Sequence, residues 1–154
     1  MTAPAKGPIA GWLLTVCGAL GLAAAAILSY EKYRLLENPF YVPSCSVNET
    51  VSCTQIMQSA QSSAFGFPNP YLGLVGFAVV LTTGVVVLAG ARLARWYWLG
   101  LAGGILAGAA FVLWLMYQSI VVIGALCPYC MVVWAVMIVL TGALARGALR
   151  ARRG

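Results

Sequence analysis

Residues 126–145 read LCPYCMVVWAVMIVLTGALA, a run without a single charged side chain. A helix needs about 20 predominantly apolar residues to cross a bilayer, so this run predicts a transmembrane helix. Three other stretches meet the same requirement, namely residues 9–30, 71–90 and 96–123. The sequence therefore predicts an all-α, polytopic membrane protein with a four-transmembrane-helix bundle. We expect residues 1–154 to form one integral-membrane domain, in which the first apolar run is a retained helix.

The composition supports this assignment. Of the 154 residues, 62% are hydrophobic and 8% are charged, whereas about a quarter of an ordinary soluble domain is charged. The chain has no histidine, which excludes histidine-based catalysis and histidine ligands for zinc or haem. The net charge is +6, but the basic residues lie at the ends of apolar runs. That distribution sets membrane topology and does not form a nucleic-acid-binding patch.

The charges also predict how the bundle is oriented. By the positive-inside rule, the side with most basic residues is cytoplasmic. We therefore expect both termini inside and an external loop over residues 31–70, whereas a three-helix alternative would split the basic clusters. Seven of the nine basic residues fall on the inner side, namely Lys6, Arg92, Arg95, Arg146, Arg150, Arg152 and Arg153. Lys32 and Arg34 fall outside, beside the three acids Glu31, Glu37 and Glu49.

The motif Cys127-Pro-Tyr-Cys130 opens the last apolar run. Pro128 suits the first position of a helix, which places Cys127 at the cap and Cys130 about one turn deeper. Unpaired N–H groups at a helix N-terminus stabilise a thiolate and raise its reactivity. The pair is therefore a candidate for reversible redox chemistry on the external, oxidising side.

A second cysteine pair, Cys45 and Cys53, lies in the external loop. Ser52 and Gln55 form a capping-box pattern, which predicts a short amphipathic helix over residues 53–61 on the membrane surface. Cys53 would then point toward the helix that carries Cys127, which indicates relay of a disulfide between the pairs by exchange. Cys45 lies in a segment without a helical pattern, which we expect to be mobile. Cys17, inside the first run, is expected to pack as a small hydrophobic residue.

Other interpretations stay open at this point. The four outer cysteines would suffice for a zinc site, or for disulfides with a purely structural role. A non-enzymatic tetraspan scaffold and a small transporter are alternative functions, although a transporter would need buried charges within its spans. Glycines at positions 100, 103, 104 and 108 are expected to let the third span pack closely against its neighbours.

The spacing Cys45-x7-Cys53, followed by two spans and then Cys127-Pro-Tyr-Cys130, resembles the vitamin K epoxide reductase family. The similarity is to bacterial homologues without a fused thioredoxin-like domain, and it covers nearly the whole chain. Ser52 before the second loop cysteine fits the family, as does Asn69 ahead of Leu72-Gly73. DsbB-type quinone-linked oxidases carry their two pairs in the reverse order.

The resemblance implies a membrane thiol–quinone oxidoreductase. Electrons would pass from a separate thioredoxin-like or DsbA-like protein through Cys45 and Cys53, then through Cys127 and Cys130, to a quinone of the menaquinone, ubiquinone or vitamin K type. This activity supports disulfide bond formation, or quinone and vitamin K epoxide reduction, and it needs no metal. A bacterial plasma (inner) membrane is the expected location, with the cysteine pairs on the external side.

The resemblance also implies quinone-binding residues. Asn69 would donate a hydrogen bond to a quinone carbonyl, and Ser52 and Trp134 are further candidates. Trp134 stands where coumarin-sensitive members often carry a tyrosine, and its indole N–H can replace the tyrosine hydroxyl as a donor. Aromatic residues at helical spacing more often serve packing, but six of them are also candidate walls of the quinone site, namely Phe65, Phe67, Tyr71, Phe111, Trp114 and Tyr117.

Overall fold

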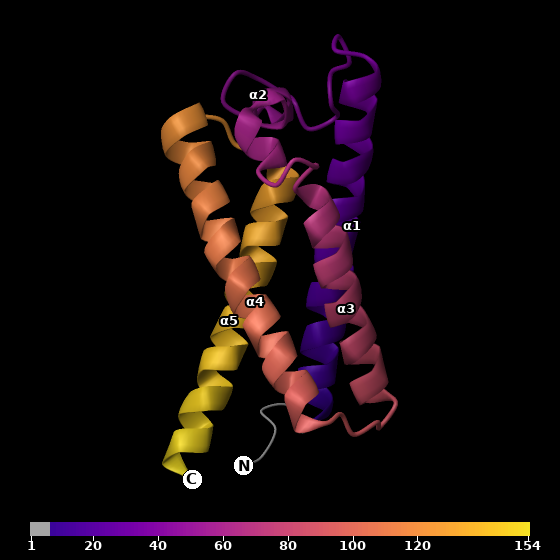
Figure 1. Ribbon diagram of the computed structural model, residues 1–154, viewed down its shortest axis with the longest axis vertical. Coiled ribbons are helices and arrows are strands. Elements are labelled where there is room, and N and C mark those ends of the chain that lie inside the picture. The colour runs from indigo at the N-terminus through magenta and orange to yellow at the C-terminus, as the bar shows by residue number, and fades with distance from the viewer. Residues whose placement is uncertain (1–6) are drawn as a thin grey trace.

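The computed structural model describes residues 7–154, so Lys6 lies outside the described part of the chain. It is a bundle of long helices capped at one end by a short helix (Figure 1). The long helices are α1 (Pro8–Glu37), α3 (Pro70–Leu88), α4 (Arg95–Tyr117) and α5 (Pro128–Arg153). The short elements are helix α2 (Cys53–Gln58), the 3-10 turn η1 (Ala60–Ser63) and the π-helical segment η2 (Gln118–Ile123), which continues α4.

All four long helices are long and apolar enough to cross a membrane, which confirms the predicted tetraspan bundle. Two boundaries differ from the prediction. Helix α1 continues past residue 30 to Glu37, so Glu31, Lys32 and Arg34 lie on a helix and not in the external loop. A hydrogen bond from Tyr33 to Glu37, one turn apart, supports this extra helix. Helix α5 begins at Pro128 and runs to Arg153, which is further than the predicted end at residue 145.

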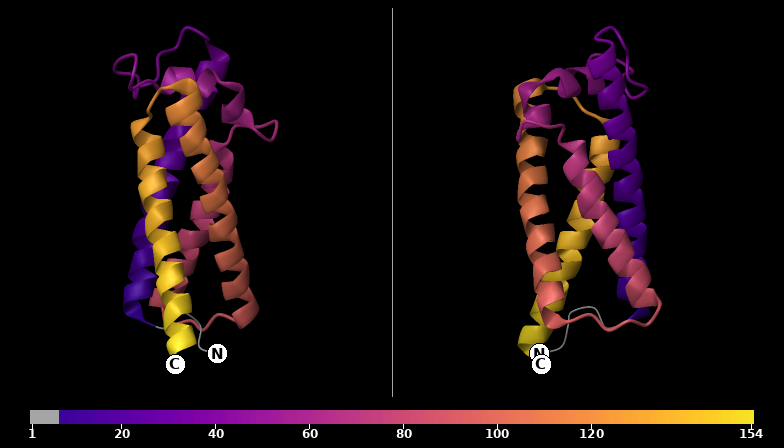
Figure 2. Two further views of the ribbon diagram at one scale, coloured as in Figure 1. Left: turned by 90° about the vertical axis from the view of Figure 1, so that its left-hand side faces the viewer. Right: turned by 45° about the vertical axis from the view of Figure 1, so that its right-hand side comes forward.

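The two ends of the bundle are chemically different. The start of α1, the connection between α3 and α4 with Arg92, and the basic end of α5 lie together at one end (Figure 1). Helix α2 and the loop that carries Cys45 and Cys53 lie at the opposite end, beside the N-terminal ends of α3 and α5 (Figures 1 and 2). The chain therefore crosses an even number of times and gathers its candidate chemistry at one end, which we call the outer end.

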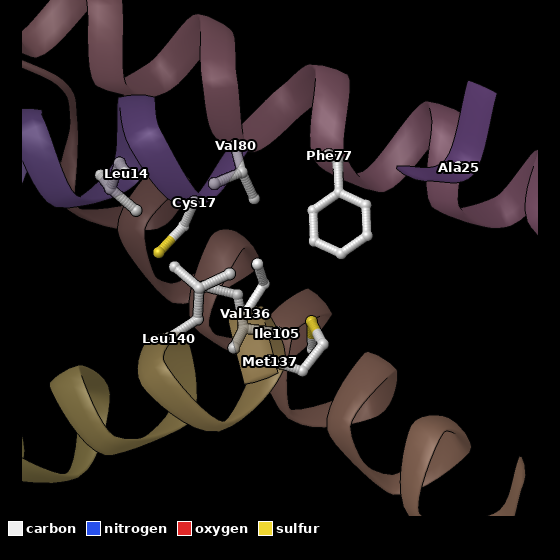
Figure 3. Packing of buried hydrophobic residues seen from close by; sticks show 9 residues of the cluster. All are labelled: Leu14, Cys17, Ala25, Phe77, Val80, Ile105, Val136, Met137 and Leu140. Carbon is white, nitrogen blue, oxygen red and sulfur yellow. The ribbon is translucent and has the colours of Figure 1, made fainter. Parts of the chain in front are cut away.

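Helices α1 and α3 pack backbone against backbone. A Cβ atom added at Gly18 would lie 2.5 Å from the backbone nitrogen of Leu81, and one at Gly21 would collide with the ring of Phe77. In lipid, such close approach replaces the hydrophobic effect as a source of helix association. Phe77 and Cys17 belong to a core shared by α1, α3, α4 and α5 (Figure 3). The structure thus gives Cys17 the packing position that its sequence context predicts.

The glycines of α4 do not behave as expected. A Cβ atom at Gly100, Gly103 or Gly104 would meet no atom of another helix within 4 Å, so none of the three brings another helix close. Only Gly108 is near a neighbour, because its Cβ would lie 3.2 Å from the end of the Met137 side chain in α5. The prediction that these glycines serve close packing is therefore wrong for most of α4, and close packing occurs between α1 and α3.

Candidate functional site

Three sulfur atoms meet at the outer end of the bundle. Cys45 and Cys53 form a disulfide, while Cys127 and Cys130 are free thiols. The Sγ atom of Cys127 lies 2.8 Å from that of Cys53, which is closer than the ~3–3.5 Å of a near-attack geometry. Cys45, Cys53 and Cys127 are only 4%, 0% and 1% exposed. The contact therefore joins the two cysteine pairs in a buried place that a large thiol cannot reach.

Backbone hydrogen bonds hold the loop against the start of α5. The N–H of Ser52 donates to the carbonyl of Leu126 at 3.1 Å, and the N–H of Leu126 donates to the carbonyl of Thr50 at 2.8 Å. Gly124 makes the preceding turn possible, because it adopts φ 72°, which other residues disfavour. These two bonds form a parallel bridge between the loop and the start of α5. Cys53 directly follows Ser52 and Cys127 directly follows Leu126, so the bridge places the two cysteines on facing segments.

The predicted helix on the loop forms in part as expected. The Ser52 side chain accepts a hydrogen bond from the Gln55 N–H and caps α2, as the capping box predicts. The reciprocal half is absent, because the Ser52 N–H is used by Leu126 and the Gln55 side chain donates to Glu49 instead. Cys53 and Met57 are buried on the inner face, whereas Ala60 is exposed and begins the 3-10 turn.

The extra outer turns of α1 hold the segment that precedes Cys45. The Glu31 carboxylate, 4% exposed, accepts hydrogen bonds from the Tyr41 hydroxyl at 2.9 Å and from the Ser44 hydroxyl at 2.5 Å and N–H at 3.3 Å. The guanidinium of Arg34 lies over the Tyr41 ring. The bond to Glu31 raises the pKa of Tyr41. Because of these contacts, the segment that was expected to be mobile is held down.

Lys32, the next residue, holds the other side of the loop. Its Nζ atom donates to the carbonyl of Met57 and, at 2.9 Å, to the hydroxyl of Ser62. In the sequence, Glu31 and Lys32 stand among the external charges, and neither role is predicted from it. No local signal reveals them, because their partners lie 10 to 30 residues away in the chain.

The start of α5 prepares Cys127 for reaction. Cys127 occupies the cap position and Pro128 the first turn, as the sequence predicts. A hydrogen bond with the Cys130 thiol, together with the N–H groups of Cys130 and Tyr129, holds the pKa of Cys127 below its usual value, although burial opposes this. A lower pKa makes Cys127 reactive in disulfide exchange with Cys53, because its thiolate leaves readily when a mixed disulfide between the two is resolved.

A cavity of about 570 Å³ extends from these cysteines into the bundle. Its volume lies within the ~300–1,000 Å³ typical of small-molecule sites. The outer end is polar and reactive, with side chains from every long helix and α2, whereas the remainder is apolar. The residues at the outer end include Lys32, Cys53, Ser59, Gln61, Ser62, Asn69, Gln118, Cys127 and Cys130. The apolar part includes Gly76, Phe77, Val80, Gly100, Leu101, Gly104, Ile105, Val112, Val133 and Met137.

The predicted quinone-binding residues have different positions. Asn69 and Trp134 both line the cavity, and Asn69 also joins parts of the loop by donating to the Gln61 carbonyl at 2.6 Å and accepting from the Ala64 N–H. Ser52 caps α2 and is not among the residues that line the cavity. Of the six aromatic residues considered as walls, Phe111 lines the cavity, and it stacks with Trp114 and contacts Phe65.

The sulfur cluster fits exchange better than metal binding. The Sγ atoms of Cys45, Cys53 and Cys127 lie within 4.8 Å of one another, as metal ligands do. Two of the three are joined in a disulfide, however, and a disulfide offers no thiolate to a metal. A thiol in contact with a disulfide is the arrangement from which disulfide exchange begins.

One comparison with known proteins bears on this site. A sequence model described as the vitamin K epoxide reductase family matches residues 12–144, which is nearly the whole chain. The matched region contains both cysteine pairs, the short helix α2 and every residue that lines the cavity.

The sulfur geometry predicts which mixed disulfide forms. In the double variant Cys45→Ala/Cys130→Ala, the remaining Cys53 and Cys127 should join under mild oxidation, because their Sγ atoms are already 2.8 Å apart. Peptide mapping by mass spectrometry measures the yield. Cys45→Ala/Cys127→Ala is the matched control, in which Cys53 and Cys130 should stay mostly reduced. Equal yields in the two variants would contradict the contact.

The hydrogen bonds of Glu31 predict how the loop disulfide is protected. Glu31→Gln should speed reduction of the Cys45–Cys53 disulfide by a protein dithiol about ten-fold, since hydrogen bonds to a charged group are each worth ~1.5–3 kcal/mol. Alkylation and gel shift at timed intervals measure the rate. Glu37→Gln, which removes an exposed acid of the same helix, should leave the rate unchanged. An equal rate in wild type and Glu31→Gln would show that Glu31 does not guard Cys45.

Proposed function

The chain belongs to the vitamin K epoxide reductase family, and from that premise we propose that it passes electrons from the thiols of a partner protein to a membrane quinone. It is an integral membrane oxidoreductase whose family acts on thiols and quinones. The observation that carries the proposal is the contact of Cys53 with Cys127, directly above a cavity that Cys130 lines. Sulfur atoms thus connect the loop with the interior of the bundle.

The relay that we propose begins at Cys45. A donor thiolate attacks the Sγ of Cys45, which breaks the bond to Cys53 and releases Cys53 as a thiolate. A second donor thiol resolves the mixed disulfide, so that the donor leaves oxidised and Cys45 and Cys53 are both reduced. Two electrons have then entered the loop pair. Cys45 suits this role because the other member of the pair, Cys53, is the one in contact with Cys127.

The loop pair then reduces the pair at α5. Cys53 attacks the Sγ of Cys127 in a Cys127–Cys130 disulfide, and Cys130 leaves as a thiolate. Attack of Cys45 on Cys53 re-forms the loop disulfide and frees Cys127. The result is an oxidised loop pair beside two free thiols, which is the covalent state of the structure. This state is ready to pass two electrons inward.

The cavity fits a quinone as the electron acceptor. A bound quinone takes two electrons and two protons, which Cys127 and Cys130 give up as their disulfide closes. Cys130 is the member of the pair that lies within α5 beside the cavity, so it would face the quinone ring. Asn69 has two amide N–H groups and spends one on Gln61, so the other can hold a quinone carbonyl. Trp134 lines the cavity one turn deeper in α5.

The apolar remainder of the cavity would hold the isoprenoid tail. Helices α3 and α4 pack mainly against other helices, and a hydrogen bond between the hydroxyls of Thr83 and Tyr97, 2.6 Å long, joins them near the basic end. Gly76 of α3 and Gly100 of α4 line the cavity on the outer side of this hydrogen bond, and a Cβ atom at either position would meet no neighbouring helix. A lipid-soluble tail could therefore run along the glycines and leave sideways into the membrane.

We further propose that the outer end faces the external side of a bacterial inner membrane. The basic residues at the other end support this orientation by the positive-inside rule. Thiol donors of the thioredoxin-like or DsbA-like kind would then be extracytoplasmic, where disulfides are made. In a membrane of this kind the reaction supports disulfide bond formation. The alternative role within the family is reduction of vitamin K epoxide by the same thiols.

A quinone-reduction assay tests the proposed function. Purified protein with a reduced thioredoxin-like donor should reduce a soluble quinone, and Cys130→Ala should lose the activity almost completely. Cys17→Ala is the matched control, because Cys17 packs in the core away from the outer cysteines, and its activity should stay within about two-fold of wild type. If the wild type consumes no quinone while dithiothreitol lowers its thermal stability, the protein is a scaffold with structural disulfides.

The glycines that line the apolar part of the cavity predict selectivity for the length of the isoprenoid tail. Gly104→Leu should fill the apolar part and lower turnover of a quinone with a long isoprenoid tail about ten-fold or more, while a tail-less analogue is reduced nearly as before. Steady-state kinetics with the two quinones measure the ratio. Gly103→Leu adds the same side chain to the neighbouring position, which does not line the cavity, and should leave both rates unchanged. Equal losses with both quinones would place the tail elsewhere.

A further inference from the structure

Lys32 is the one charged side chain that lines the cavity, within the part of the chain that the structure describes. It is 8% exposed. Its ammonium group meets a carbonyl and a hydroxyl oxygen and no carboxylate, because Glu31 next to it is engaged with Tyr41 and Ser44. A cation has therefore been buried at the outer end of the bundle without a counter-ion.

The role of Lys32 in holding the loop does not explain the charge. The carbonyl of Met57 and the hydroxyl of Ser62 accept hydrogen bonds from neutral donors equally well. Burying an ammonium group costs far more than burying an amide, and the cost is offset only by an anion or by several strong acceptors. Ionisable side chains within membrane proteins mark functional sites for this reason, and the question becomes which anion Lys32 serves.

The position of Lys32 identifies that anion. An ammonium group has three N–H donors, and two of them are used by Met57 and Ser62, which leaves one for the cavity. Lys32 lines the cavity together with Cys127, Cys130 and Asn69, so it shares the polar end where electrons would arrive. We propose that Lys32 binds the quinone oxygen on which negative charge develops during reduction.

This assignment rests on the proposed function and adds a residue to it. Reduction moves two electrons and two protons from Cys127 and Cys130 to the quinone, and negative charge stays on a quinone oxygen until its proton arrives. A neutral quinone carbonyl gains little from a nearby cation, whereas an anionic oxygen gains much in a cavity with a largely apolar lining. Lys32 therefore stabilises the charged state selectively, which is how a fixed charge accelerates a reaction.

Binding of two matched ligands tests the proposal without turnover. One is a hydroxynaphthoquinone whose hydroxyl group is ionised at neutral pH, and the other is its neutral methoxy analogue. Titration in detergent micelles, followed by tryptophan fluorescence, gives both dissociation constants. Wild type should prefer the anionic ligand by about ten-fold, the scale of one hydrogen bond to a charged group. Lys32→Arg should keep that preference, and Lys32→Gln, which still donates to the loop, should lose it.

Arg34→Gln is the matched control. Arg34 lies on the same helix, carries the same charge and does not line the cavity, so its removal should leave the preference intact. Several results would overturn the assignment: a wild type that binds both ligands equally, a Lys32→Gln variant that keeps the preference or weakens both ligands alike, or an Arg34→Gln variant that loses the preference. A wild type that binds neither naphthoquinone would overturn the proposed quinone site as well.

Discussion

The contact between the sulfurs of Cys53 and Cys127 is the constraint on which the rest of the outer end depends. The two residues are 74 positions apart in the chain, and exchange between them needs their sulfur atoms within ~3.5 Å of each other. A loop alone does not hold such a distance. The parallel bridge at Leu126 supplies the register, and Glu31 and Lys32 press the two flanks of the loop onto the bundle. The long outer turns of α1 are therefore part of the site and not a simple continuation of a span.

The same burial that fixes this contact also closes it to a protein donor. Cys45 is nearly as buried as Cys53, so a donor reaches it only if part of the loop lifts. The two flanks are not equivalent in this respect. The flank before Cys45 is held by side-chain hydrogen bonds to Glu31, whereas the flank at Cys53 is held by backbone bonds to α5 and by α2 packing beneath Lys32. Movement of the first flank would expose Cys45 and would leave the backbone bonds that hold Cys53 beside Cys127 in place.

Much of the fold follows from the sequence because its signals are local. Apolar length predicts the four spans, Pro128 predicts the start of α5, and Ser52 predicts the cap of α2. The roles of Glu31 and Lys32 could not be predicted, since a charge just past an apolar run looks the same whether it faces water or folds back on a distant loop. The glycines of α4 show the same limit. A small residue either admits a neighbouring backbone or leaves room for a ligand, and only the position of the neighbouring helix decides between them.

These two uses of glycine are linked in this bundle. Gly18 and Gly21 draw α1 against α3 so closely that this pair has no space to enclose a ligand. Helix α4 packs on α5 near Gly108 and stands apart from α3 over most of its length, with Gly100 and Gly104 facing the space between them. The bundle thus consists of one tightly packed pair that supports the redox loop through α1, and one looser side that leaves a cavity. Because Glu31 and Lys32 belong to the tight pair, a ligand that enters or leaves the loose side does not need to move these two anchors of the loop. In the proposed function, access of the donor therefore depends on the loop flank held by Glu31, and access of the quinone depends on the loose side of the bundle.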